Sequence, residues 1–460
     1  MIPVTGGRVW VDRLLRDGRI ERGVLLEADA AGTVVGEQVG RSRPDDALAL
    51  DLAVPGFGNA HSHAFHRALR GRTHESGSFW TWREAMYRAA ARLDPDLYRE
   101  FATAVFSEML AGGWTAVGEF HYVHHRPDGS PYPDHAMELA LADAAEAAGI
   151  RLVLLDTCYL AGGIDRPLSP EQLRFGDGDA GRWLRRWRSL SAALAGRSPL
   201  VTLGAAIHSV RAVPREDIRR IAAELPNDVP LHIHLSEQPA ENEESLTAYG
   251  LTPAAVLSET GALGERLSVV HATHLTAADI RLLGDARAHA VFCPTTEADL
   301  GDGIGPATEL VQAGVRLAVG SDQNAVADAL LELRGLEAGE RLRSLRRGRL
   351  SPEVLWRIGS EGGYGSLGLE TPSRLGGPLD LVELDDSSLR TAGSRPEQLA
   401  LTATATDVRR TVVGGSVRTL APDTAETLAG VVRRIFEDPQ VPARAGADPD
   451  VAGTNAEESE

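Results

Sequence analysis

The chain has 460 residues, of which 43% are hydrophobic and 24% are charged, and its 47 basic and 65 acidic side chains give a formal net charge of -18. This acidic balance excludes the basic footprint that is typical of nucleic-acid-binding proteins. The sequence contains no Lys, which also excludes a lysine Schiff base and a P-loop lysine.

Residues 1–52 are expected to form short strands separated by turns. Strand-like stretches occur at residues 6–12, 23–29 and 33–40, with Gly and Asp between them. This region lacks the continuous apolar stretch of a signal peptide, and no run of 18 apolar residues occurs in the chain. We therefore expect a cytoplasmic protein that makes no contact with a membrane.

From residue 53 to about residue 370, short apolar runs alternate with helical patterns. Eight runs are candidate strands, at residues 52–57, 114–120, 151–157, 200–207, 230–236, 267–273, 289–295 and 315–321. Between the first two, Asp94 and Pro95 suit the start of a helix that Gly112 would end. Strands and helices that alternate eight times predict an α/β fold with a parallel (β/α)₈ TIM barrel.

Residues 371–438 return to short strands and turns and end in a helix. The simplest arrangement joins them to residues 1–52 in one small composite β-sandwich domain beside the barrel. Residues 439–460 are rich in Ala, Asp, Glu, Gly and Pro, so we expect a disordered tail there.

The candidate chemistry lies just after the apolar runs, where TIM-barrel enzymes place their catalytic groups. Histidines and carboxylates recur at these ends of the runs. His61, His63, His208, Glu237 and Asp322 follow a run, whereas His234 and His271 lie within the fifth and sixth runs. His61 and His63 are two residues apart in an extended stretch, so both imidazoles leave the chain on the same side. Imidazoles with one carboxylate are typical ligands of zinc or a similar divalent ion. The two cysteines are far apart and indicate neither a disulfide framework nor a thiolate site.

Each of these residues also has a simpler structural interpretation. A lone His-x-His pair can occur by chance, and His232 is more simply a core histidine below the site. Glu237 and Asp322 alone could be loop carboxylates or helix N-caps. Five of eight strand ends carry groups of this kind, however, and this convergence favours a functional site.

Four motifs together resemble the amidohydrolase superfamily in its mononuclear deaminase branch. They are HSH at residues 61–63, HIHLSE at 232–237, VVHATH at 269–274 and VGSDQN at 319–324. Longer stretches, among them NAHSHAFHRALRG, SFWTWREAMYR, AIHSVRAV and CPTTEADLGDG, resemble the formimidoylglutamate deiminase family between about residues 55 and 363.

This resemblance implies one zinc ion per subunit, or Fe²⁺ or another divalent ion in its place, held by His61, His63, His234 and Asp322. A zinc-bound hydroxide would attack the formimino carbon of N-formimidoyl-L-glutamate, a substrate of histidine degradation. Glu237 would act as the proton shuttle, so that N-formyl-L-glutamate and ammonia form. His271 would stabilise the hydroxide, and Asp322 would share the role of base. The absence of Lys agrees with a single metal, because binuclear relatives use a carboxylated lysine as a bridge.

The implied substrate is a small dicarboxylate, so its site needs fixed cations, and Arg binds a carboxylate through two hydrogen bonds. The positions that match the family's substrate-binding residues are Arg83, Tyr122, His208 and Arg211. Residues 70–92 form a long excursion after a catalytic strand, which suits a loop that covers substrate. His66 stands where the family carries Gln, and neutral imidazole offers the formimino group fewer hydrogen bonds than an amide.

Alternatives stay open on the sequence alone. The same chemistry could act on an aminopurine, on S-adenosylhomocysteine or on another formimino or guanidino acid. A catalytically inactive barrel kept as a scaffold would bind no zinc, and Arg83 could form an ordinary surface salt bridge. A second metal at His121, His124 and His125 is disfavoured, because the sequence after them is typical of a loop. We expect a homodimer, which is the commonest oligomer among soluble enzymes.

Overall fold

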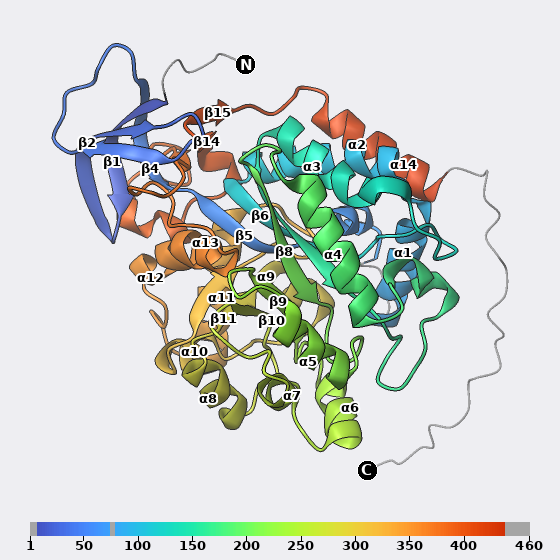
Figure 1. Ribbon diagram of the computed structural model, residues 1–460. Coiled ribbons are helices and arrows are strands. Elements are labelled where there is room, and N and C mark those ends of the chain that lie inside the picture. Colours follow the sequence, from blue (N-terminus) through green and yellow to red (C-terminus); the bar gives the residue numbers. More distant parts are fainter. Residues whose placement is uncertain (1–6, 74–78, 438–460) are drawn as a thin grey trace.

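A closed barrel of eight parallel strands forms the centre of the computed structural model, which describes residues 7–73 and 79–437 (Figure 1). The strands are β5 (Phe57–Ser62), β6 (Trp114–His121), β7 (Arg151–Cys158), β8 (Val201–Ile207), β9 (Leu231–Leu235), β10 (Leu267–His271), β11 (His289–Phe292) and β12 (Arg316–Val319). They follow one another around the barrel in chain order, and β12 closes it against β5. The predicted (β/α)₈ TIM barrel is confirmed.

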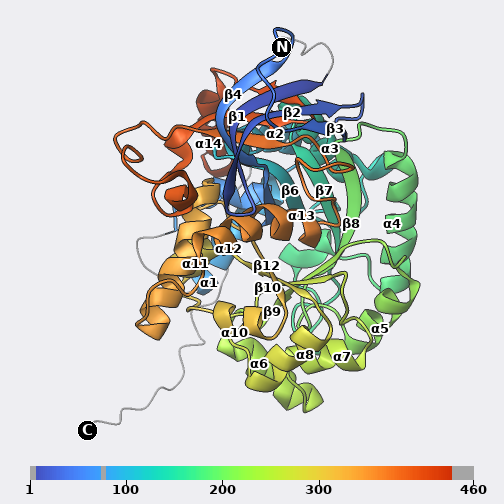
Figure 2. The same cartoon turned by 90° about the vertical axis from the view of Figure 1, so that its left-hand side faces the viewer.

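Helices cover the outside of the barrel, as Figure 2 shows. They include α2 (Pro95–Ala111), α3 (Ala136–Ala148), α4 (Ala180–Leu194), α5 (Arg215–Glu224), α6 (Pro239–Tyr249), α7 (Pro253–Glu259), α8 (Ala277–Asp285), α10 (Ala307–Gln312) and α11 (Ala329–Ser344). Further short helices are η1 (Ala64–Leu69), η3 (Pro170–Phe175), α9 (Pro294–Leu300), α12 (Pro352–Arg357) and α13 (Gly363–Ser366). Strands enclosed in this way are buried on both faces, which explains their almost continuous apolar sequences.

The helix α2 begins and ends where the sequence predicts. The carboxylate of Asp94 accepts a hydrogen bond from the backbone N–H of Leu97, Pro95 occupies the first turn, and Gly112 is the C-cap. Its apolar face is buried against the barrel. The last helix, α14 (Thr424–Phe436), packs against α2, so the end of the described chain returns to the barrel surface.

The two ends of the chain together build one small sheet beside the barrel, as predicted. Its strands are β1 (Arg8–Arg16), β2 (Arg19–Ala28), β3 (Val34–Gln38), β4 (Leu48–Pro55), β13 (Leu381–Leu384), β14 (Val408–Val413) and β15 (Ser416–Arg418). They form a single hydrogen-bonded sheet in the order β15-β14-β13-β4-β1-β2-β3, whereas a sandwich has two sheets. The predicted tail at residues 439–460 lies outside the described residues.

The first barrel strand differs from the sequence prediction. The apolar run at residues 52–57 was expected to be that strand, but most of it belongs to β4 in the small sheet, and the barrel strand β5 starts only at Phe57. Both strands are buried, so the sequence stays apolar across the junction. Only Gly56 separates them, and a side chain there would collide with Thr115 and Asp380.

Buried Asp380 ties the small sheet to the barrel. Its carboxylate pairs with Arg151 at 3.0 Å and accepts hydrogen bonds from Tyr364 at 2.6 Å and from the backbone N–H of Gly414 at 2.7 Å. Its backbone oxygen accepts from the N–H of Gly56 at 2.8 Å. Strands of the sheet and of the barrel therefore share one polar anchor. In the described ranges, no helix combines the length and the apolar character needed to cross a bilayer.

Candidate metal centre and substrate pocket

The four predicted metal ligands come together at the carboxyl end of the barrel. His61 lies on β5, His63 follows it, His234 lies on β9, and Asp322 follows β12. Nε2 of His61 is 3.1 Å from Nε2 of His234 and 3.4 Å from Oδ1 of Asp322. Nε2 of His63 is 3.5 Å from the same carboxylate oxygen. All four side chains are buried. The donor atoms of His61, His63 and His234 lie within 4.8 Å of one another, and the Asp322 carboxylate lies beside two of them.

Hydrogen bonds to backbone carbonyls fix how two of these imidazoles are protonated. Nδ1 of His63 lies 2.8 Å from the oxygen of Phe120, and Nδ1 of His234 lies 3.0 Å from the oxygen of His208. A carbonyl only accepts, so each Nδ1 carries the proton and each Nε2 keeps a lone pair. Burial lowers the pKa of His63 to about 3 and holds the pKa of His234 well below its usual range. Neutral imidazoles with inward lone pairs beside one carboxylate fit a divalent cation.

The backbone at this end of the barrel is held in a conformation that non-glycine residues rarely adopt. The φ angles of Ser236, His271 and Asp322 are 51°, 69° and 42°. Such left-handed residues are strained and tend to cluster at functional sites. The amide of Asn324 donates to the backbone oxygens of His63 and Asp322, both at 3.1 Å, and so helps to hold two ligand segments together.

His61, His63, His234 and Asp322 form what we call the ligand cluster. Three carboxylates surround His271 beside it. Its Nε2 is 3.9 Å from Glu237 and 3.9 Å from Asp322, and its Nδ1 is 3.5 Å from Glu297. Burial alone would lower the pKa of His271, but these carboxylates raise it to about 10. Glu237 and His271 therefore lie next to the predicted ligands. Glu297 was not singled out from the sequence, although it stands just after the seventh barrel strand, in the quoted motif CPTTEADLGDG.

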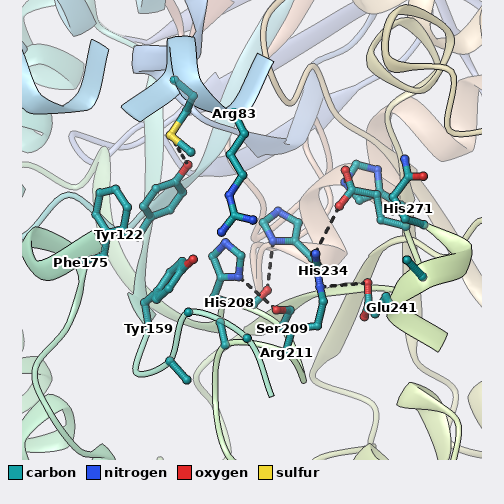
Figure 3. A pocket seen from close by; sticks show the side chains of 18 of the residues that line it. Arg83, Tyr122, Tyr159, Phe175, His208, Ser209, Arg211, His234, Glu241 and His271 are labelled. Atoms are coloured by element: carbon teal, nitrogen blue, oxygen red, sulfur yellow. Dashed lines mark hydrogen bonds and ion pairs between the residues drawn. The ribbon is translucent and has the colours of Figure 1, made fainter. Parts of the chain in front are cut away.

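A cavity of about 270 Å³ opens next to this centre (Figure 3). All five predicted substrate-binding residues line it, namely His66, Arg83, Tyr122, His208 and Arg211. Side chains of the ligand cluster, together with Glu237 and His271, line the same cavity. The structure thus brings together every site residue that the sequence predicted.

Helix α1 (Phe79–Arg92) forms one wall of this cavity, where a covering loop was expected. It contributes Trp82, Arg83, Met86 and Tyr87. Residues spaced by three or four positions along a helix share one face, which explains why these side chains enter the cavity together. The part of the excursion at residues 74–78 lies outside the described residues.

Three arginines line the cavity, namely Arg166 and the two predicted substrate-binding residues Arg83 and Arg211. Figure 3 shows the Arg83 guanidinium above the His208 imidazole and Arg211 directed toward Glu241. Nε of Arg83 donates to the hydroxyl of Tyr87 at 2.6 Å. The guanidinium of Arg211 lies 3.7 Å from both Glu237 and Glu241. Both cations are held by neighbours within reach of a bound anion.

His66 occupies the wall between the ligand cluster and α1. Its Nε2 lies 2.9 Å from the hydroxyl of Tyr122, and its ring packs edge-on against Trp82. Its Nδ1 is buried and has no hydrogen-bond partner among the described residues. Burial holds the pKa of His66 well below its usual range, so the ring is neutral.

Two further histidines have structural roles outside this centre. Nε2 of His232 lies 2.9 Å from the backbone oxygen of Ser366, which confirms the expected core histidine. His124 pairs with buried Glu138 at 2.7 Å. Arg186 contacts the same carboxylate at 3.1 Å, so His124 and Glu138, at the disfavoured second metal site, belong to an ion-pair network.

The sequence prediction missed several residues of the pocket wall. Tyr87, Tyr159 and Glu241 line the cavity, and Glu241 is completely buried beside Arg211. Tyr159 comes directly after the strand at residues 151–158, so its position marked it as a candidate. A phenol, however, is neither a usual metal ligand nor a usual acid-base group at neutral pH, so the residue type gave no signal.

Comparison with known proteins places the chain among hydrolases of one family. Residues 52–416 match the model of the amidohydrolase family. The chain is 39% identical to formimidoylglutamate deiminase of Pseudomonas aeruginosa over 408 residues, which cover 85% of this chain and 89% of that protein. It is 28% identical to 5-methylthioadenosine/S-adenosylhomocysteine deaminase of Halobacterium salinarum over 90% of this chain and 91% of that one.

A crystal structure of an amidohydrolase from Brucella melitensis has a similar fold. The two chains superpose with a TM-score of 0.86 at 29% identity, and the match covers 93% of this chain and 99% of the other. The barrel and the small sheet built from both chain ends therefore recur together in a solved structure.

Proposed function

Because the chain belongs to the amidohydrolase family, and is thus a hydrolase, we propose that it converts N-formimidoyl-L-glutamate and water into N-formyl-L-glutamate and ammonia. The observation that carries this proposal is the cavity itself, which Arg83 and Arg211 line beside the four predicted metal ligands. The reaction would belong to histidine degradation, as the resemblance of the sequence implies.

The ligand set supports one divalent cation, which we take to be zinc. His61, His63, His234 and Asp322 would hold it, since they offer three neutral imidazoles and one carboxylate without a thiolate. When bound, such a cation supplies the Lewis acidity that makes water a nucleophile at neutral pH.

Glu237 is placed to move protons during the reaction. It follows the ligand His234 by three residues and lies beside His271. Its carboxylate accepts a proton from the attacking water and delivers it to the imino nitrogen. It then passes the second proton of that water to the same nitrogen as the C–N bond breaks, so that the nitrogen leaves as ammonia. His271, held among carboxylates, donates a hydrogen bond to the attacking oxygen. The water oxygen thereby becomes the carbonyl oxygen of the formyl product.

The two carboxylates of the substrate match the cations of the cavity. Arg83 and Arg211 would bind them, and Tyr122 and His208 would add hydrogen bonds. An aminopurine carries no such negative charges, so it would leave both arginines without an anionic partner. This difference is the reason for preferring a dicarboxylate substrate.

The direct test is ammonia release by the purified enzyme. We expect kcat/KM for N-formimidoyl-L-glutamate to exceed that for adenosine, S-adenosylhomocysteine, N-formimidoylglycine and guanidino acids by at least about 100-fold, the size expected when a charged hydrogen-bonding group is left unpaired. Metal analysis of the same sample should find about one zinc or other divalent ion per chain. A preference for an aminopurine would overturn the substrate assignment, and a protein without bound metal would overturn the mechanism.

A further inference from the structure

Behind the cavity wall, the side chain of Gln172 joins two tyrosines that line the cavity. Gln172 lies on η3, is only 2% exposed and does not line the cavity. Its Nε2 donates to the hydroxyl of Tyr159 at 2.8 Å and to the hydroxyl of Tyr87 at 3.1 Å. One amide nitrogen therefore links α1 to the segment that follows β7.

The orientation of this amide is fixed by a third hydrogen bond. Oε1 of Gln172 accepts from the backbone N–H of Ser169 at 2.9 Å. Because a backbone N–H can only donate, the oxygen must face Ser169 and the NH₂ group must face the tyrosines. Both amide protons are then used, one on each phenol oxygen.

This count leaves both phenol protons without an acceptor. The Tyr87 oxygen accepts from Gln172 and from Nε of Arg83, while the Tyr159 oxygen accepts from Gln172. Within the described ranges, neither hydroxyl has a partner for its own proton. Burial raises the pKa of Tyr159 to about 12, so this hydroxyl keeps its proton at neutral pH. Tyr159 is buried, whereas Tyr87 is half-buried. A buried donor without a partner is costly and is complementary to an acceptor on a ligand.

Tyr159 lies on the other side of the His208 ring from His234, as Figure 3 shows. The Tyr159 ring is 4.3 Å from the His208 ring, and the His208 ring is 5.0 Å from His234. A group bound at the tyrosines is therefore separated from the ligand histidines by about one imidazole. Two O–H donors beside the Arg83 guanidinium match the two oxygens of a carboxylate.

We propose that Gln172 is a positioning residue, which holds Tyr87 and Tyr159 as paired hydrogen-bond donors to one carboxylate of the substrate. This inference rests on the proposed function, because it names the group that the site recognises. The tyrosines contact the substrate, and Gln172 acts only through them.

Tyr159→Phe removes one donor and keeps the ring. We expect it to weaken binding of glutarate, a plain dicarboxylate, by about 10-fold or more, as for a lost hydrogen bond to a charged group. In turnover of N-formimidoyl-L-glutamate, KM should rise by a similar factor, while kcat changes much less. Tyr249→Phe, at the end of α6 outside the cavity, is the matched control and should change neither value.

Variants of Gln172 separate a positioning role from a merely structural one. Gln172→Glu has the same shape but accepts instead of donating, so both phenol protons turn toward it and away from the cavity. Gln172→Met removes the hydrogen bonds and leaves the phenol protons free. We expect glutarate affinity to fall by about 10- to 100-fold in Gln172→Glu and by less in Gln172→Met. A residue that only fills space would give equal losses or the reverse order.

The experiment combines calorimetry of glutarate binding to the holoenzyme with kinetics on two shortened substrates. N-formimidoyl-L-glutamine lacks the side-chain carboxylate, and 4-formimidoylaminobutanoate lacks the α-carboxylate. The effect of Tyr159→Phe should vanish for the substrate that lacks the recognised carboxylate. Unchanged glutarate affinity in Tyr159→Phe, or equal effects on both substrates, would overturn the inference. If the wild-type enzyme releases no ammonia from N-formimidoyl-L-glutamate, the proposed function fails, whereas glutarate binding still decides the role of Gln172.

Discussion

The carboxylate of Glu237 lies 3.9 Å from Nε2 of His271, and the same nitrogen lies 3.9 Å from Asp322. Glu237→Gln keeps the size of the side chain but cannot exchange protons. We expect the variant to keep its metal and to lose turnover by about 100-fold or more, which is the usual size of acid-base effects. Metal analysis and kcat measured on the same sample check this, with Glu243→Gln on the exposed face of α6 as the control. Full activity in Glu237→Gln would rule out the proton shuttle.

Removing one imidazole should abolish metal binding. His234→Ala removes one of the three neutral nitrogens that would bind the metal. Loss of a residue that only hydrogen-bonds to a metal ligand lowers metal affinity by roughly 10- to 100-fold, so we expect a larger loss here. Metal binding stabilises the folded state, so the Tm of this variant should no longer respond to added zinc. His135→Ala, at an exposed position bonded to Ser189, is the control and should keep its metal. Equal metal content in the two variants would contradict the assigned centre.

The charge on Arg211 should decide which substrates bind. Arg211→Met keeps much of the side-chain volume and removes the guanidinium that faces Glu237 and Glu241. We expect kcat/KM for N-formimidoyl-L-glutamate to fall by about 10- to 100-fold, the range for a lost charge-assisted hydrogen bond. Arg220→Met on the exposed side of α5 should leave it unchanged. An unaltered kcat/KM in Arg211→Met would mean that this arginine does not bind the substrate.

His66 departs from the residue that its family is expected to carry. Nε2 of its imidazole is hydrogen-bonded to the Tyr122 hydroxyl, so only Nδ1 remains for a bound ligand. His66→Gln supplies both a donor and an acceptor, so we expect kcat/KM for N-formimidoyl-L-glutamate to rise by about 2- to 10-fold, the worth of one neutral hydrogen bond. Metal content should not change. Lower activity in His66→Gln would show that the pocket of this chain is adapted to imidazole.

Buried Glu332 on α11 should make stability depend on pH. Its carboxylate accepts from the N–H of Thr295 at 3.0 Å, and burial raises its pKa to about 8. The folded chain therefore keeps this proton up to about pH 8, whereas the unfolded chain loses it near pH 4.3. Between these values the unfolded state binds fewer protons, so this group makes stability fall as pH rises, by about 1.4 kcal/mol per pH unit.

Glu332→Gln removes this titration. Urea unfolding of the wild type and the variant between pH 5 and pH 8 should show the free energy of unfolding of the wild type falling relative to that of Glu332→Gln. Glu426→Gln, at an exposed position on α14, should follow the wild type. Parallel pH profiles for the wild type and Glu332→Gln would mean that Glu332 is ionised in the folded state.

The sequence predicted the structure best at positions where the local structure favours one residue type. Asp94, Pro95 and Gly112 marked the bounds of α2, and histidines after barrel strands marked the ligand cluster. The β4 and β5 strands were joined in one prediction because an apolar run does not show which sheet each half pairs with. Gln172 could not be found at all, since its contacts depend on where α1 and β7 meet in space.

The junction at Gly56 has a practical consequence for protein engineering. A single residue separates the small sheet from the strand that carries His61. Asp380 is hydrogen-bonded to this residue and contacts both the sheet and the barrel. Cutting the gene at the start of the barrel would leave one end of that strand unattached. Asp380 would then lose its contacts with the small sheet. The hydrolase is therefore one inseparable unit, and a minimal catalyst would have to keep both ends of the polypeptide.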